Sequence, residues 1–73
     1  MDAEEIKNIL DAEQTDEEKK KDLITNEIPK LGEHPSEEIV RILFRIIKKP
    51  TINEATSGVY DAAVSYLKSI QRY

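Results

Sequence analysis

Apolar residues recur at helical spacing in four segments of the chain, and no run alternates between apolar and polar as a β-strand does. The spacing predicts helices over about residues 2–11, 15–31, 35–49 and 51–72. The connections between these segments are short, which favours antiparallel packing of successive helices. The pattern therefore predicts an all-α fold.

The first helical segment is repeated in the third. Residues 3–10 and 36–43 are identical at five of eight positions, at an offset of 33. Further along, the second and fourth segments match at an offset of 36. Self-similarity at this period is typical of repeated helix–turn–helix units. We therefore predict two tandem αα-hairpins, 2–32 and 34–72, in one compact four-helix domain that spans residues 1–73.

Residues that start and stop helices fit this arrangement. The pairs Thr15–Glu18 and Thr51–Glu54 have the spacing of a capping box, which predicts that the second and fourth helices begin there. Pro29 removes a backbone donor late in the second helix, so we expect a kink or an early end there. Gly32 is expected to end that helix.

The third helix is expected to be central. Its apolar residues between Ile39 and Ile47 cover roughly 200° of the helix, more than a surface helix needs. The first helix has only a narrow apolar stripe, formed by Ile6, Ile9 and Leu10. It should therefore depend on packing against the rest of the domain.

The fourth helix carries a candidate interface. A line of small residues runs along it, and small side chains let another helix approach closely. Larger apolar side chains flank that line. The predicted interface consists of Gly58, Tyr60, Ala62, Val64, Ser65, Leu67 and Ser69. Two repeats leave apolar flanks that a longer array would cover, so we expect a homodimer or a protein partner. The alternative is that the small residues pack the fourth helix onto the second within one chain.

Charge is distributed unevenly along the chain. Residues 1–38 carry a net charge of −8 and residues 39–73 a net charge of +4. The third helix presents a candidate basic strip that consists of Arg41, Arg45, Lys48 and Lys49. Such a strip is either a solvated surface, a protein interface or a phosphate-binding face. The acidic isoelectric point near 4.9 argues against nucleic acid as the partner.

Residues for catalysis are scarce. The chain has no Cys, and its one His, His34, precedes Pro35 in a turn. A single His falls short of a metal site or a nucleophile–base pair. With only Gly32 and Gly58, no glycine-rich phosphate loop exists. We therefore expect no enzyme activity, no cofactor, no bound metal and no small-molecule ligand.

The sequence predicts neither a membrane span nor a secretory signal. No apolar run approaches the roughly 18 residues that a membrane span needs. The N-terminal segment is acidic and lacks the apolar region of a secretory signal. These features predict a soluble, cytoplasmic protein that does not enter membranes.

The C-terminal half resembles a family of short archaeal α-helical proteins. The resemblance rests on Ile42-Leu43-x-x-Ile46-x-x-x-Pro50, on Thr56, and on Val64-Ser65-x-Leu67-x-Ser69-Ile70. The chain departs from that family after Pro50, where it has Thr51-Ile52-Asn53, and it has no Trp in the last helix. The resemblance implies an all-helical fold and self-association, and it implies no activity.

Together, these sequence patterns predict a small non-enzymatic helical interaction module that acts by self-association or protein binding. The alternative is a nucleic-acid-associated protein that uses the basic strip.

Overall fold

A computed structural model describes residues 2–12, 16–32 and 34–73. All regular secondary structure within these ranges is helical, which confirms the predicted all-α class. The α-helices are α1 (Ala3–Asp11), α2 (Glu17–Asp22), α3 (Glu37–Lys48), α4 (Ile52–Thr56) and α5 (Val59–Ser69). A π-helical turn, η1 (Leu23–Glu27), and a 3-10 turn, η2 (Ile28–Leu31), continue α2 without a gap.

Side chains cap the first and third helices. Asp2 accepts a hydrogen bond of 2.9 Å from the backbone N–H of Glu5 at the start of α1. Ser36 accepts one of 3.3 Å from the N–H of Ile39 at the start of α3. Each bond satisfies one of the backbone donors that a helix start leaves unpaired.

The second helix differs from its prediction at the start, where another residue is the cap. Asp16, rather than Thr15, is the N-cap, and its carboxylate accepts a 2.8 Å bond from the N–H of Lys19. Thr15 itself lies outside the described residues. The helix is irregular near Pro29, as expected: regular α-helix ends at Asp22, and the chain widens into the π-helical turn before the proline and then tightens into the 3-10 turn. Gly32 ends the helix with a φ of 102°, as predicted.

The fourth helix is broken, which corrects the single helix predicted over 51–72. α4 ends at Thr56, and Gly58 adopts a left-handed conformation with a φ of 91° before α5 begins. Gly58 therefore does not lie mid-helix, and its absent side chain serves the backbone turn. α5 then ends at Ser69, short of the predicted Arg72.

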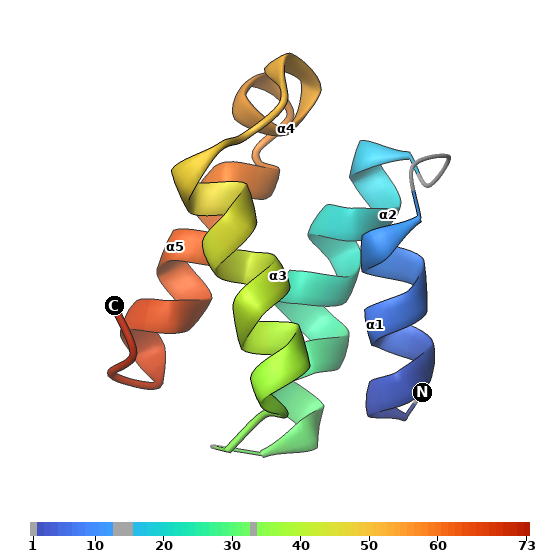
Figure 1. The fold of residues 1–73 in the computed structure, drawn as a ribbon, viewed down its shortest axis with the longest axis vertical. Helices are drawn as coiled ribbons and strands as arrows, with labels where there is room; N and C mark the ends of the chain where they lie inside the picture. The colour runs from blue at the N-terminus through green and yellow to red at the C-terminus, as the bar shows by residue number, and fades with distance from the viewer. Residues whose placement is uncertain (1, 13–15, 33) are drawn as a thin grey trace.

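The long helices pack around a shared interior (Figure 1). α3 lies between α1 and α5, and α5 packs in turn against α2 and η1. In the view of Figure 1, α1 and α3 run upward, whereas α2 and α5 run downward. α4 projects at the top, beyond the end of α3. α5 and α2 are thus parallel neighbours on the side of the molecule away from the viewer.

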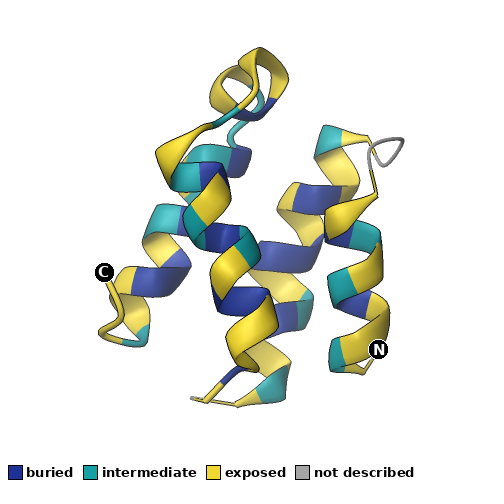
Figure 2. Cartoon of the chain, in the orientation of Figure 1, coloured by how far each residue is buried: buried dark blue, intermediate teal, exposed yellow. Residues whose placement is uncertain are grey.

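The core draws on every long helix, as the buried bands in Figure 2 show. α3 contributes Ile39, Val40, Leu43 and Ile46, which confirms its central place. In the narrow stripe of α1, Ile6 and Leu10 are 0% and 1% exposed, and Ile9 is partly buried against the core.

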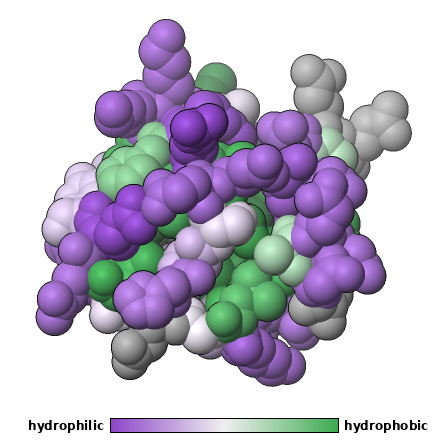
Figure 3. Space-filling view, turned by 60° about the horizontal axis from the view of Figure 1, so that its bottom comes forward, coloured by the Kyte–Doolittle hydropathy of each residue, from purple (hydrophilic) through white to green (hydrophobic). Residues whose placement is uncertain are grey.

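On the surface shown in Figure 3, hydrophilic side chains separate the apolar patches from one another. Among the described residues, none of the helices is both long and apolar enough to cross a bilayer.

Replacing Gly58 should destabilise the fold through the backbone. An Ala there must adopt a φ of 91°, so we expect Gly58→Ala to cost about 1–2 kcal/mol. An added Cβ would also lie 3.3 Å from Nζ of Lys21, which is flexible and can move away. Asn tolerates left-handed conformations better, so Gly58→Asn should cost less. Urea denaturation measures both free energies of unfolding. Equal losses for the two variants would show that backbone strain is not the main cause.

Candidate functional site

An open groove of about 460 Å³ runs between α5 and the helix formed by α2 and η1. We call it the α2–α5 groove. One wall consists of residues from the start to the end of α5, namely Gly58, Asp61, Ala62, Ser65, Tyr66 and Ser69. The opposite wall consists of Lys21, Ile24, Thr25 and Pro29. No segment of the described chain fills the groove.

The predicted line of small residues lies in this groove. Gly58, Ala62, Ser65 and Ser69 all belong to its α5 wall. They recur every three or four residues, which places them on one face of a helix. The structure bears on one of the two alternatives drawn from the sequence, the packing of the fourth helix onto the second within one chain; the interface with a partner stays a prediction. α5 packs against α2 and η1 within the chain, and the small side chains leave a hollow along that contact.

The flanking apolar residues of the predicted interface divide into two kinds. Leu67 is 0% exposed and belongs to the core, so it offers no surface to a partner and its inclusion was wrong. Its burial follows from the close packing of α5 on α3. Tyr60 and Val64 are partly buried, and neither lines the groove.

Tyr66 closes the inner side of the groove. Its side chain is 6% exposed, and its hydroxyl oxygen is buried with no hydrogen-bond partner among the described residues. Burial of the phenol raises its pKa above the ordinary value of 10.0. The hydroxyl therefore stays neutral at physiological pH.

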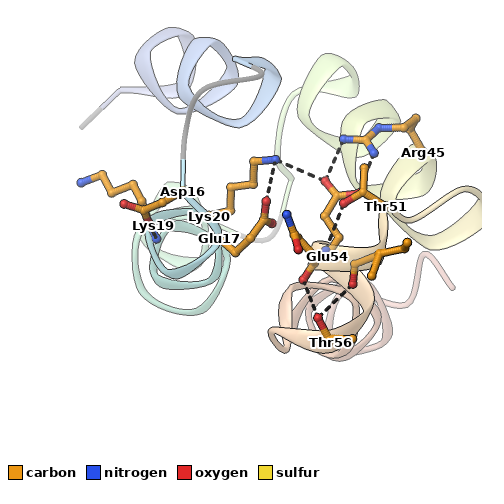
Figure 4. Close-up of polar contacts among 10 residues, drawn as sticks. Asp16, Glu17, Lys19, Lys20, Arg45, Thr51, Glu54 and Thr56 are labelled. Carbon is orange, nitrogen blue, oxygen red and sulfur yellow. Dashed lines mark hydrogen bonds and ion pairs between the residues drawn. The ribbon is translucent and has the colours of Figure 1, made fainter.

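The strongest polar feature is a buried carboxylate, that of Glu54, which is 0% exposed (Figure 4). Arg45 donates to both of its oxygens, at 2.8 Å and 3.1 Å. Lys20, which is itself only 6% exposed, donates to it at 3.3 Å. The backbone N–H of Thr51 donates at 2.9 Å, and the Thr51 hydroxyl accepts from the N–H of Glu54 at 3.0 Å. We call Lys20, Arg45, Thr51 and Glu54 the Glu54 cluster.

The cluster holds Glu54 strongly ionised. Burial by itself would raise the pKa of this carboxyl group. The hydrogen bonds from Arg45 and Thr51 and the positive charges of Arg45 and Lys20 outweigh that effect, and they lower the pKa to about 2. The carboxylate thus has no proton to donate at physiological pH, and its oxygens are occupied by structural partners.

This arrangement leaves fewer cations of the predicted basic strip available to a partner. Arg45 makes a two-pronged ion pair with Glu54, so its guanidinium is only partly available to a phosphate. Arg41, Lys48 and Lys49 are exposed, and none of them forms a salt bridge of 4.0 Å or less with another described residue. All four side chains therefore lie on the surface, and within the described residues only Arg45 among them is held in an ion pair.

Sequence reasoning found part of this cluster and missed the rest. The spacing of Thr51 and Glu54 identified the capping box, and both of its hydrogen bonds are present. It did not reveal that Glu54 would be buried or that Lys20 would join it from a helix 34 residues away. A wholly buried Glu requires cations close to it, and residue spacing along the chain does not show which cations those are.

Within residues 2–12, 16–32 and 34–73, no three side chains of His, Cys, Asp or Glu are grouped to hold a metal ion. The chain matches no protein-family model, no curated protein and no solved structure. The resemblance to the archaeal helical family therefore stays a prediction. The α2–α5 groove is the candidate functional site, and the Glu54 cluster is structural.

The Glu54 cluster should make stability depend on acid. The pKa of Glu54 is about 2 in the folded protein and near 4.5 without these partners, so the ion pairs stabilise the fold above pH 4.5. This contribution, about 3 kcal/mol, should be lost as the pH falls from 4.5 to 2.

Glu54→Gln provides the comparison, because it leaves Lys20 and Arg45 without a counter-charge at every pH. It should cost about 3–5 kcal/mol at pH 7 and much less at pH 2. Chemical denaturation at both pH values measures the difference between the two proteins. Parallel pH curves for wild type and variant would contradict the assignment. Glu37→Gln, which removes an exposed partner of Arg72, is the control and should change stability less.

Proposed function

We propose that this chain is a small non-enzymatic interaction module that acts by self-association through the α2–α5 groove. The observation that carries the proposal is the groove itself, whose α5 wall is built from small residues and is left open by the chain. Small side chains allow a helix of a partner to approach the backbone of α5 closely. Burial of this surface would add to the core of a domain that has only 73 residues.

The proposal extends to the architecture. We propose that residues 2–32 and 34–72 are two copies of one αα-hairpin unit. The pair Ile6 and Ile39 and the pair Leu10 and Leu43 correspond at an offset of 33, and all four side chains are buried. α1 packs on α3, and the helix that contains α2 packs beside α5, as stacked hairpins do. In such a stack, the surface of the last unit is where a further copy would add.

Binding of nucleic acid through the basic strip has less support. Arg45 is engaged by Glu54, and the net charge of the chain is −4. A phosphate-binding surface relies on several uncompensated cations, and an overall negative charge opposes the approach of DNA or RNA.

Self-association should depend on the α5 wall of the groove. Wild-type protein is expected to form a dimer at high micromolar concentration in sedimentation equilibrium. Ala62→Glu places a charge in the groove and should shift the protein to the 8.4 kDa monomer, whereas circular dichroism should show an unchanged helical fold. Ala55→Glu, at an exposed position of α4 outside the groove, is the matched control and should leave the dimer intact. A single 8.4 kDa species for the wild type would refute self-association.

A further inference from the structure

The two walls of the α2–α5 groove carry opposite charges at the same end. Lys21 lies on the α2 wall and Asp61 on the α5 wall, and both side chains are exposed. Among the described residues, neither Lys21 nor Asp61 makes a salt bridge within 4.0 Å. Nζ of Lys21 lies 3.3 Å from the position that a Cβ of Gly58 would occupy, so Lys21 reaches the start of α5. Asp61 is one helical turn further along.

The walls also run in the same direction. In Figure 1 both α2 and α5 descend from the top of the molecule, so the charged end of one wall lies beside the charged end of the other. Four residues beyond Lys21 on one wall is Thr25, and four residues beyond Gly58 on the other is Ala62. Thr25 and Ala62 are thus equally far along the groove from its charged end, on opposite walls.

These observations restrict how a second copy would fit. A two-fold axis that runs along the groove places α5 of one copy against α2 and η1 of the other at the same height. Lys21 of each copy then faces Asp61 of its mate. A two-fold axis across the groove instead places α5 antiparallel to its mate, and it moves the charged end against the uncharged end near Ser69 and Pro29.

We infer that the groove is covered by a second copy whose two-fold axis runs along it, with Lys21 of each chain paired to Asp61 of the other. This inference rests on the self-association proposed above and specifies its geometry. α5 and α2–η1 of the two copies form a four-helix layer around the former groove, with Ala62 and Ser65 allowing close contact. A stable interface of standard size takes about 800 Å² per partner, which is about one sixth of the 4768 Å² surface of the chain.

Charge reversal tests the pairing directly. Lys21→Glu faces Asp61 of the mate with a second negative charge, and Asp61→Lys faces Lys21 with a second positive charge. Each variant alone should raise the dissociation constant of the dimer by about tenfold, since two symmetric pairs change from attraction to repulsion. The double variant K21E/D61K should return the constant to within about threefold of wild type. An equimolar mixture of the two single variants should form the heterodimer.

Lys19→Glu is the matched control, because Lys19 is exposed on the same helix and lies outside the groove. It makes the same change in net charge and should leave the dissociation constant within about twofold of wild type. Sedimentation equilibrium at low salt measures all five proteins. Circular dichroism verifies that each is folded.

Cross-linking provides a second measurement, because the chain has no cysteine of its own. A mixture of Thr25→Cys and Ala62→Cys chains should form a disulfide between the two variants. Ala62→Cys alone should not, because the two α5 helices are then diagonal in the four-helix layer.

Each outcome has a distinct meaning. A wild-type dimer that K21E leaves unchanged, or an Ala62→Cys chain that cross-links to itself, overturns the axis along the groove and leaves self-association standing. A wild type that stays monomeric overturns both proposals.

Discussion

The carboxylate of Glu54 joins three segments of the chain at one buried point. Through Thr51 it holds the start of α4, through Arg45 it is tied to α3, and through Lys20 it is tied to α2. A carboxylate that is wholly removed from water is stable only while its cations stay in place. The projecting turn of α4 is therefore not free to move relative to the ends of α2 and α3.

The position of α4 in turn determines how α5 enters the fold. Only Ser57 and Gly58 separate the two helices, and the left-handed conformation of Gly58 redirects the chain. α5 then descends beside α2, where Lys21 lies over Gly58 and leaves no room for a larger residue without a shift. The α2–α5 groove is thus a consequence of the Glu54 cluster, although the two share no residue. Loss of the buried ion pairs would alter the groove through the path of the chain.

The sequence repeat accounts for the first half of each unit better than for the second. Helix starts at Asp2 and Ser36, the core positions of α1 and α3, and the end at Gly32 follow from local rules that need no tertiary contact. The offset of 36, however, relates Glu18 to Glu54 and Asp22 to Gly58. Glu18 is exposed in an unbroken helix, whereas Glu54 is buried just before a break.

The difference between these two equivalents could not be predicted from spacing. Glu54 is buried because Lys20 approaches from a separate helix, which is a property of the packed structure. Likewise, the wide apolar pattern of the fourth segment suggested that Leu67 faces a partner, whereas α3 covers it in the core. The small residues were identified correctly as a feature of α5. Their role in an open groove became apparent only once α2 and η1 were placed opposite them.

The division of side-chain sizes explains why the groove lies on this side of the molecule. α3 directs bulky aliphatic residues inward and is covered by α1 and α5, so its surroundings are closely filled. α5 packs against α3 and buries four of its side chains, Val59, Ala63, Tyr66 and Leu67. Its small residues Ala62, Ser65 and Ser69 line the groove. No described segment of the chain lies against that face of the helix. In the dimer proposed above, the opposite charges of Lys21 and Asp61 would favour a second copy on this uncovered surface, because a two-fold partner would supply a counter-charge to each.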